Sequence, residues 1–361
     1  MQIKELEVAF VRAQFRFAVA ERRRLWIKLS KLLGNGVPIL DALTSLQQRR
    51  VAMSGPKDVT AVALQAWINQ IKGGQRFGNA IMGWVDTSEM MLISAGEQSG
   101  NLAESLQSTA NVMDATKAIK SAVIGGLAYP VLMLLIAFGV LVMFSFQIIP
   151  QFATIIPDDQ WVGLSKVMVD FSNFAREWMA VIVGVPVALV VALSYAMPRW
   201  VGGYRIVADR YLPFSVYRVI HGSTWMISFA ALVGSGMRIE NALQQLSVGA
   251  SPWMKARIDA CLRGMRAGLN PGDALARSGY GFPDPEIIDD LGVYARLSGF
   301  DQALALLGKE WVTESVERIQ GLMKAVFGVS ILVVGLFIAF MVGGLIAMQL
   351  HMSDVMQGGL Q

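Results

Sequence analysis

Three long stretches without a charged side chain constrain the fold of this chain more than any other feature of its sequence. No Asp, Glu, Lys or Arg occurs within residues 121–157, 178–198 or 325–353. Each stretch reaches or exceeds the roughly 20 residues that an α-helix needs to cross the hydrocarbon core of a bilayer. Buried helices of soluble proteins rarely run this long without one charge. The sequence therefore predicts three transmembrane helices, over residues 121–147, 178–198 and 324–349.

Positive charge is distributed unevenly over the segments between these stretches. Of the 31 Lys and Arg residues, fifteen lie within residues 1–122, fourteen within 198–324 and two within 148–178. Cytoplasmic segments of membrane proteins carry an excess of Lys and Arg, so we expect both basic regions in the cytosol. The loop 148–177 and the tail 350–361 are then expected on the other side of the membrane.

The two basic regions resemble each other. LSKLLGNGVPILDALTSL at residues 29–46 aligns with FAALVGSGMRIENALQQL at residues 229–246. Within this alignment Gly34 and Gly36 match Gly234 and Gly236 at a constant offset of 200 residues. We expect these glycines to separate two helices, to let their backbones approach closely, or to serve packing only.

The similarity continues further along each region. Residues 74–81 parallel residues 268–275, where Asn79 and Asp273 are expected to be helix N-caps. Ser99-Gly100 then parallels Ser298-Gly299 before another predicted helix. Each region ends in a transmembrane segment, so the chain is predicted to be a duplication of a helical domain followed by a span, with the middle span inserted between the copies.

The periodicity inside a copy is that of an α-helix. In residues 25–43 leucine and valine recur every three or four positions and form one apolar stripe. No segment keeps a period of two with β-branched residues, so we expect no sheet. The predicted fold class is an all-α membrane protein with two related cytosolic helical-bundle domains, 25–120 and 199–323, and three transmembrane helices. A basic segment, 1–24, precedes them, and we expect an ordinary packed helix there, with membrane or partner docking as alternatives.

The stretch ISAGEQSGNLAESL at residues 93–106 is the most distinctive part of the cytosolic regions. Its Gly and Ser residues, with Ser99 and Gly100 at the centre, predict a turn between two helices. Glu97 lies in this turn. Three roles remain open for Glu97: a local hydrogen-bond acceptor, a contact with a partner protein, or a ligand of a cation.

The predicted transmembrane helices contain two features that affect packing. Pro130 interrupts the first one, and a membrane-buried proline is expected to kink the helix or to act as a hinge. Small residues recur every fourth position on one face of the second and of the third, namely Gly184, Ala188, Ala192 and Ala196, and Gly335, Ala339, Gly343 and Ala347. Such faces let helices pack closely, so we expect them to be buried within the chain or across an oligomer.

Several functional classes lack their motifs in this sequence. There is no G-x-x-x-x-G-K-[ST] phosphate loop and no G-x-S-x-G nucleophile elbow. Cys261 is the only cysteine, and with His221 and His351 alone it offers too few ligands for structural zinc. Basic residues do not form a stripe interleaved with aromatics, so anionic lipid is a better partner than nucleic acid. We therefore expect no catalytic residue, no cofactor and no bound metal.

Taken together, these residues resemble one family. The duplicated domain and span, the AGEQSGNL stretch and Ala128-Tyr129-Pro130 in the first span resemble the type II secretion F-domain family, over residues from about 26 to 349. Glu97, Ser99 and Gly100 match its G-E-x-[ST]-G motif. Gly34 with Gly36, and Gly234 with Gly236, match its first helical hairpin, and Pro130 matches the proline of its first span.

The resemblance implies a function. Members are inner-membrane platform proteins of type IV pili, type IVb pili among them, and of type II secretion systems. It implies a bacterial inner-membrane protein with a cytoplasmic N-terminus and a periplasmic C-terminus. It also implies a homo-oligomer that contacts a hexameric cytosolic ATPase, pilin or pseudopilin subunits and other inner-membrane assembly proteins. Arg22 to Arg24 and exposed residues near Glu97 are candidates for facing the ATPase.

The two copies differ at one position of the family motif, and two other functional classes remain open. The position equivalent to Glu97 in the second copy is Arg296, so the role of Glu97 is not expected to be duplicated. The alternative function is a transporter or channel component with internal duplication, and it predicts broken helices lined by polar residues. A membrane sensor or scaffold unrelated to filaments is the third class.

Overall fold

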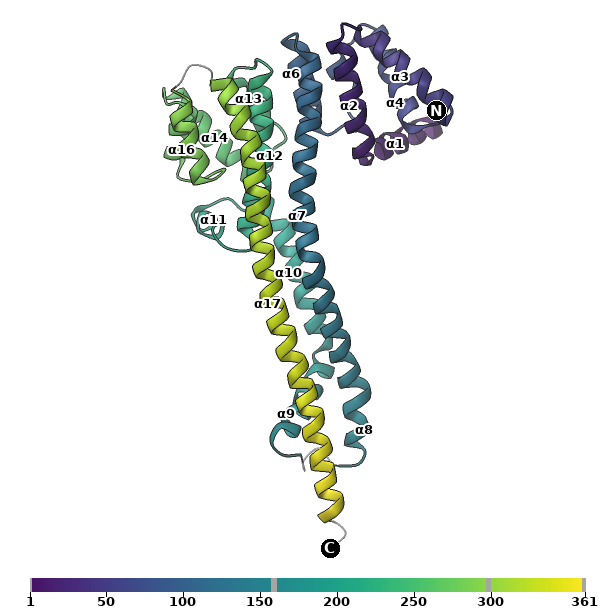
Figure 1. Ribbon diagram of the computed structural model, residues 1–361, viewed down its shortest axis with the longest axis vertical. Coiled ribbons are helices and arrows are strands. Elements are labelled where there is room, and N and C mark those ends of the chain that lie inside the picture. The colour runs from purple at the N-terminus through teal and green to yellow at the C-terminus, as the bar shows by residue number, and fades with distance from the viewer. Residues whose placement is uncertain (1, 157–160, 297–299, 359–361) are drawn as a thin grey trace. The chain divides into compact units, whose positions relative to one another are not determined.

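Figure 1 shows the computed structural model of the chain, which describes residues 2–156, 161–296 and 300–358. These residues form helices and no strand. Three helical segments among them are long and apolar enough to cross a membrane: Leu102–Phe152, Met179–Arg199 and Leu306–Asp354. The predicted all-α class with three transmembrane helices is confirmed. Ser298 and Gly299, predicted to parallel Ser99-Gly100, lie outside the described residues.

The chain divides into two compact units. The first contains Met1–Lys120 and Met197–Val316, and the second contains Ser121–Ala196 and Glu317–Gln361. The first unit thus holds both copies of the predicted duplication, and the second holds the apolar segments. Two helices, α7 (Leu102–Met143) and α17 (Phe300–Gly358), contribute residues to both units.

The duplication appears as the same order of helices in both copies. The first copy consists of α2 (Val19–Gly34), α3 (Ile39–Ser54), α4 (Val59–Lys72), α5 (Phe77–Ala80), α6 (Thr87–Gln98) and the start of α7. The second consists of α12 (Phe214–Gly234), α13 (Ile239–Ser247), α14 (Pro252–Arg266), α15 (Pro271–Ser278), α16 (Pro285–Tyr294) and the start of α17. Helix α1 (Gln2–Phe17) precedes the first copy and α11 (Gly203–Ala208) precedes the second.

Glycines in the left-handed conformation end the first helix of each copy. Gly36 has φ +80° and Gly236 has φ +89°. In the first copy the amides of Gly36 and Val37 donate to the carbonyls of Leu33 and Leu32, and the amides of Gly236 and Met237 make the equivalent bonds. This is a Schellman motif, in which glycine avoids the Cβ clash of that conformation. No neighbouring atom lies within 4 Å of a Cβ built at Gly34, Gly36 or Gly234, so these glycines separate helices and do not mediate close backbone approach.

The core of the first copy is built around stacked aromatic rings. The ring centroids of Trp26 and Trp67 lie 5.7 Å apart and nearly parallel, and Phe15 meets Trp67 edge-on at 5.5 Å. Phe15 comes from α1 and is fully buried. Helix α1 therefore packs into this core, as the packed-helix alternative predicted, while Phe10 and Phe17 on the same helix are 64% and 84% exposed.

The core of the second copy is also aromatic, and it receives side chains from the first copy. Trp225 stacks on Phe229 with a centroid distance of 5.2 Å, and Trp253 meets Phe282 edge-on at 5.6 Å. Four residues of the first copy belong to the same hydrophobic cluster: Leu92 and Ala95 on α6, and Val112 and Ala115 on α7. We call this cluster the shared core; the first copy also has a core of its own, around Trp26 and Trp67.

The second unit contains a helix in the segment predicted to be an extramembrane loop. The π-helical turn Phe144–Ile148 and α8 (Ile149–Ala153) follow α7, and α9 (Gly163–Glu177) precedes α10 (Met179–Arg199). Met168 of α9 clusters with Met341 and Met348 of α17, all buried. The apolar face of α9 explains why this segment folds onto α17.

The small residues that pack tightly in this unit are not the ones that the sequence pattern selected. Helix α10 has no buried residue, so burial of its small face within the chain is wrong. A Cβ at Gly126 would instead lie 2.3 Å from Cγ of Met323, and one at Gly344 would lie 2.8 Å from Sδ of Met168. Burial of the predicted faces across an oligomer stays a prediction. Pro130 lies inside α7, which continues through it.

We predict different effects of alanine on stability at two glycines of the first unit. A Cβ at Gly272 would lie 2.1 Å from the backbone nitrogen of Gly292, where only the backbone could move. Overpacking of this kind costs about 1–3 kcal/mol, so Gly272→Ala should lower the melting temperature of the purified chain in detergent. Gly34→Ala is the control, because that position is helical and open. Equal effects of the two substitutions would contradict the close approach of α15 and α16.

Candidate functional site

The structure brings the Ser-Gly turn of the first copy to the hairpin turn of the second copy. Helix α6 ends at Gln98, and Gly100, with φ +80°, closes it with the amides of Gly100 and Asn101 donating to Glu97 and Gly96. This is again a Schellman motif. A Cβ built at Gly236 would lie 3.8 Å from the Cβ of Ser99. Two sequence motifs from different copies therefore meet at one place.

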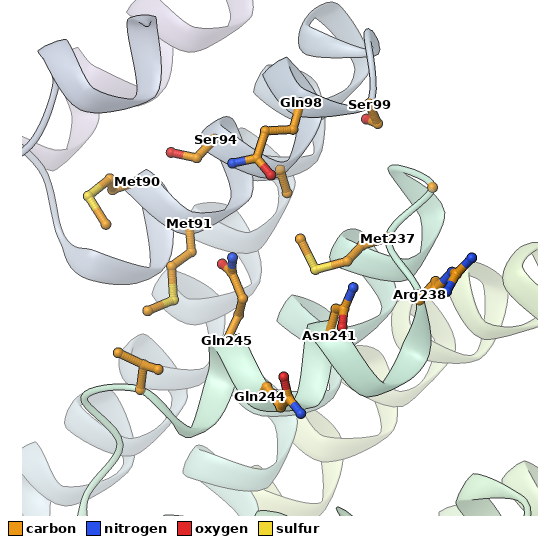
Figure 2. A pocket seen from close by; sticks show the side chains of 13 residues that line it. Met90, Met91, Ser94, Gln98, Ser99, Met237, Arg238, Asn241, Gln244 and Gln245 are labelled. Atoms are coloured by element: carbon orange, nitrogen blue, oxygen red, sulfur yellow. The ribbon is translucent and has the colours of Figure 1, made fainter.

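A pocket of about 720 Å³ opens beside this meeting point (Figure 2). Its walls are α6 and the Ser-Gly turn on one side and the α12–α13 turn with α13 on the other. The lining residues labelled in Figure 2 carry three thioethers, four amides, two hydroxyls and one guanidinium: Met90, Met91, Met237, Gln98, Asn241, Gln244, Gln245, Ser94, Ser99 and Arg238.

The chemistry of this lining suits binding and does not suit catalysis. Amides both donate and accept hydrogen bonds, and thioethers adapt to apolar groups of different shapes. None of its lining residues is His, Cys, Asp, Glu or Lys, so the pocket supplies no ordinary general acid or base. Among the described residues, no group of three or more His, Cys, Asp or Glu side chains is arranged to hold a metal ion. The pocket is thus a candidate partner-binding site with one positive charge.

Glu97, in the last turn of α6, binds the start of α5. Its Oε1 accepts a hydrogen bond from the amide of Phe77 at 2.7 Å, and Oε2 accepts one from the amide of Gly78 at 2.8 Å. These are the first two amides of α5, which its own helix leaves without partners. Among the roles left open by the sequence, the structure gives Glu97 that of local acceptor, while a partner contact and a cation ligand stay predictions.

The predicted N-caps Asn79 and Asp273 are corrected by the structure. Both are the third residue of their helices, α5 and α15. The cap of α15 is Asn270, whose Oδ1 accepts from the amide of Asp273 at 2.8 Å. In α5 the carboxylate of Glu97 serves instead. Carboxylate and amide residues are common at the third position because they also interact with the helix start, and the sequence pattern does not distinguish the two positions.

Arg296 replaces Glu97 in the second copy. It also contacts the equivalent helix start, that of α15, but it brings a positive charge to a carboxylate of that helix. Its Nη2 lies 3.4 Å from Oδ2 of Asp273. In the first copy the carboxylate comes from α6 and meets amides of α5. In the second copy the carboxylate belongs to α15 itself, and the arginine follows α16. Each copy therefore places one negative charge at this helix start, where the helix dipole favours it.

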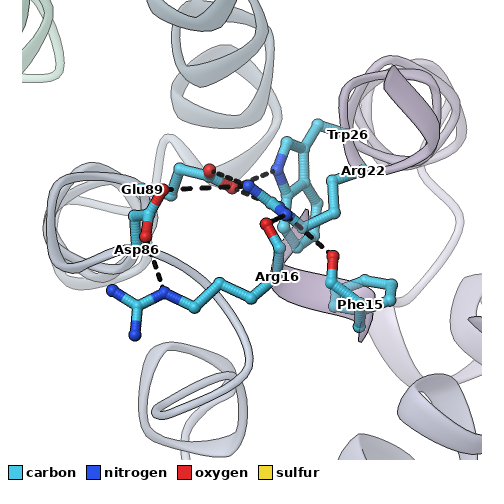
Figure 3. A network of polar contacts seen from close by, with 6 residues as sticks. All are labelled: Phe15, Arg16, Arg22, Trp26, Asp86 and Glu89. Carbon is cyan, nitrogen blue, oxygen red and sulfur yellow. Dashed lines mark hydrogen bonds and ion pairs between the residues drawn. The ribbon is translucent and has the colours of Figure 1, made fainter. Parts of the chain in front are cut away.

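A buried ion pair joins α2 to α6 in the first copy (Figure 3). Arg22 is fully buried, and its Nε and Nη2 donate to the carboxylate of Glu89 at 3.2 and 2.8 Å. Trp26 Nε1 donates to the same carboxylate at 3.1 Å, and Nη1 of Arg22 donates to the carbonyls of Phe15 and Arg16. Arg22 therefore cannot face a partner, and its predicted ATPase-facing role is wrong.

The second copy has a comparable buried network on other helices. Asp209 accepts from Arg257 Nη2 at 2.6 Å and from Trp253 Nε1 at 3.3 Å, and Arg205 Nη2 lies 3.2 Å from its other oxygen. Burial lowers the pKa of Arg257 to about 10, although Asp209 opposes the shift. A buried network of arginine, carboxylate and tryptophan therefore occurs in both parts of the first unit, although its residues occupy non-equivalent positions.

His221 lies on α12 beside these groups. Its ring centroid is 4.1 Å from that of Tyr217. Burial, followed by the charge of Lys120, lowers the pKa of His221 from 6.5 to about 4. The imidazole is therefore neutral at physiological pH, and it is half-buried beside the core of the second copy.

The structure separates the remaining predicted site residues from the pocket. Gly34 and Gly36 form the hairpin turn of the first copy, which is exposed, and Pro130 lies in the second unit. Sequence reasoning missed the pocket-lining residues of α13. A signal existed, because Asn241, Gln244 and Gln245 follow the i, i+3, i+4 spacing of one helix face opposite the buried Ala242 and Leu243.

Comparison with known proteins identifies the same repeat independently. The family model for protein F of the type II secretion system (T2SS) matches the chain twice, over residues 27–150 and 225–348. Each match begins in the first helix of a copy, α2 or α12, and ends beyond the charged part of α7 or α17.

Known relatives align with this chain at low identity, two of those named here over most of its length. The toxin coregulated pilus biosynthesis protein E of Vibrio cholerae is 22% identical over 334 residues, which cover 91% of this chain and 95% of that protein. The type IV pilus assembly protein PilC of Thermus thermophilus is 23% identical over 332 residues, 88% of this chain and 79% of that protein. The type II secretion system protein F of Xanthomonas campestris is 26% identical over 165 residues, 44% of this chain and 39% of that protein.

Removing the carboxylate of Glu97 should destabilise the first unit. Glu97→Ala leaves two partly buried amides without acceptors, and each such loss costs about 1–3 kcal/mol. Glu97→Gln keeps one acceptor oxygen, so its loss should be smaller. Thermal unfolding of the purified full-length chain measures both. Gln98→Ala, on the exposed side of the same turn, is the control, and an equal effect of Gln98→Ala would contradict the capping role.

The half-buried histidine should make the stability of the chain fall as pH falls. Because the folded pKa of His221 is about 4 and its ordinary value is 6.5, the unfolded state binds more protons between these values. The stability contribution is complete above pH 6.5, decreases down to about pH 4, and amounts to at most about 3 kcal/mol. Melting temperatures at pH 7 and pH 5 test this. His221→Gln should reduce the difference, and an unchanged difference would contradict it.

Proposed function

Because the chain belongs to the type II secretion system protein F family, we propose that it is an inner-membrane assembly platform for an extracellular filament. In this proposal it couples a cytosolic hexameric ATPase to the insertion of pilin or pseudopilin subunits into the growing filament. The duplicated family match over residues 27–150 and 225–348 carries the proposal. The names of relatives that align with most of this chain, which concern pilus biosynthesis and assembly, support it.

A pilus is the favoured filament. The relatives that align over most of this chain are named for pilus biosynthesis or pilus assembly, and the alignment with pilus biosynthesis protein E covers 95% of that protein. The secretion protein F of Xanthomonas campestris aligns with 44% of this chain. We therefore place the type IV pilus, and within it the toxin coregulated type, before a secretion system.

The distribution of charge supports the proposed orientation. The two helical copies carry most of the Lys and Arg residues, and the segment between the first and second spans carries two. In a bacterial inner membrane the copies would then lie in the cytosol with the N-terminus, and the C-terminus would lie in the periplasm. Basic side chains near the spans would contact anionic lipid headgroups.

The chain itself lacks a nucleotide-binding motif, so the energy for subunit insertion must come from another protein. The sequence has no phosphate loop, and the pocket beside Ser99 has no general acid or base. We propose that the cytosolic copies receive the ATPase, with the exposed turn around Gln98 and Ser99 as one contact. The spans, with the exposed small face of α10, would gather pilin helices, other inner-membrane assembly proteins or further copies of this chain.

The transporter alternative receives less support from the described residues. It predicted broken helices lined by polar residues at the membrane midplane. The candidate spans are continuous helical segments, although Leu102–Phe152 includes a π-helical turn near its end. No Asp, Glu, Lys or Arg lies within residues 121–157, 178–198 or 325–353 to mark an ion path.

Filament imaging in the native host tests the proposal. An in-frame deletion should abolish surface filaments seen by electron microscopy, while pilin persists in the membrane by immunoblot, and complementation should restore the filaments. Pilin persistence separates a defect in assembly from a defect in pilin synthesis. Filaments that are unchanged on deletion, together with normal protein secretion, would refute the platform function.

A further inference from the structure

The contact between the two copies pairs surfaces that are not equivalent. The first copy contributes a face of α6 and α7, with Leu92, Ala95, Val112 and Ala115 in the shared core. The second copy contributes α12 and the turn after it, where Gly236 lies beside Ser99. A heterologous contact of this kind leaves one unused surface at each end. These are the α2 face of the first copy and the α16–α17 face of the second.

The α2 face corresponds to the part of α12 that the first copy covers. The identical Schellman bonds at Gly36 and Gly236 fix the offset at 200 residues. On α12 this face consists of small side chains that are largely covered, with Ser228 3% and Ser235 4% exposed. The equivalent residues of α2, Lys28 and Asn35, are exposed. The remaining members of the face are Thr224 and Ala231 on α12, and Arg24 and Lys31 on α2, which are also exposed.

The α16 face corresponds to the part of α6 that packs on the second copy. Asp86 and Asp284 are the N-cap residues of α6 and α16. A Cβ at Gly78 would meet Ser94, and one at Gly272 would meet Gly292, which fixes the offset within α6 and α16 at 198 residues. This is one residue less than the offset between Glu97 and Arg296 at the ends of these helices. Six residues of α6 are buried, and three of them lie in the shared core or in the pocket beside the second copy, namely Met91, Leu92 and Ala95. Their equivalents are Asp289, Asp290 and Val293. The two aspartates are exposed, and Val293 is 62% exposed.

The two unused faces carry opposite charge. Arg24, Lys28 and Lys31 follow the i, i+4, i+7 spacing and lie on one side of α2. Asp290, Glu310 and Glu314 line one small pocket of about 110 Å³ between α16 and α17, with Asp289 beside them. Within the described part of the chain, none of these seven side chains takes part in an ion pair. Each face thus has the charge that the other lacks.

We propose that the acidic α16–α17 face of one protomer docks on the basic α2 face of a second copy of this chain. The contact repeats between protomers the arrangement that joins α6–α7 to α12 within one protomer. It has charge pairs where the internal contact has an apolar core. Charged side chains suit such an interface because both faces are exposed to water in a protomer that has not bound a second copy. Repetition of a heterologous contact closes into a ring or continues as an open array. The proposal goes beyond the platform function and does not depend on it.

Crosslinking between two differently tagged copies tests the contact. One full-length copy carries Lys31→Cys and the other Asp290→Cys, both co-expressed in membranes and treated with a short bismaleimide. The native Cys261 is 1% exposed, and burial raises its pKa to about 12, so it should not react. We expect a crosslinked dimer that contains both tags. Either cysteine copy expressed alone should give none, which excludes crosslinks between identical faces.

Charge reversal provides the second measurement. In this experiment one copy carries Arg24→Cys and the other carries Asp290→Cys. Adding Lys28→Glu and Lys31→Glu to the first copy should lower the yield of crosslinked dimer about tenfold, because like charges would then face each other across the interface. Asp289→Lys with Glu310→Lys in the other copy should then restore it. Lys255→Glu with Arg263→Glu, two exposed positions on α14, is the matched control and should leave the yield unchanged. Folding is checked by the melting temperature of each purified variant.

Three outcomes overturn the proposal. The first is the absence of a mixed dimer in membranes in which all variants fold. The second is a yield that reversal on one face lowers and reversal on the other does not restore. The third is an effect of reversal only on binding to vesicles that contain anionic lipid, or only on binding to the ATPase. If deletion abolishes filaments but no crosslink forms, this interface is rejected and the platform function stands. If the crosslink forms but deletion leaves filaments intact, the platform function is rejected and this interface stands.

Discussion

The packing of one copy's apolar face into the core of the other is the contact on which the rest of the first unit depends. Leu92, Ala95, Val112 and Ala115 are buried in the hydrophobic cluster that forms the core of the second copy. Fully burying a leucine or valine contributes about 1.5–3 kcal/mol, so this face favours packing of the two copies against each other over two independent domains. Because the contact joins non-equivalent surfaces, it also makes the two copies different in what they expose, although their helices follow the same order.

Helix ends repeat more faithfully than helix faces in this duplication. The Schellman bonds at Gly36 and Gly236 are the same, and a negative charge stands at the start of both α5 and α15. The means differ, because Glu97 serves one helix and Asp273 the other. Backbone groups at a helix end need partners in any sequence, so the requirement persists while the residue that meets it changes. In the family motif Gly100 is explained by left-handed backbone, Gly96 by the close approach of Ser105, and Glu97 by the two amides that it accepts.

The sequence was sufficient for the architecture and insufficient for the contacts. Charge-free stretches, a helical period and the glycine-containing repeat predict three spans and two helical copies, because these signals are local. The burial of Arg22 was not predictable in this way, since Glu89, Trp26 and the carbonyl of Phe15 reach it from positions distant in sequence. The same holds for the small-residue faces. Tight packing occurs at Gly126 and Gly344 because Met323 and Met168 lie there, which no spacing rule contains.

Charge in the two copies follows which surfaces the fold covers. On α12, Ser228 and Ala231 occupy the side that meets the first copy, where an unpaired buried charge would carry a large desolvation cost. On α2 the equivalent side is exposed, and Lys28 and Lys31 stand there. The same contrast separates Met91 and Leu92 from Asp289 and Asp290. Solubility alone does not require that the α2 face be basic and the α16–α17 face acidic. Complementary charge at both ends is what a repeated head-to-tail contact requires.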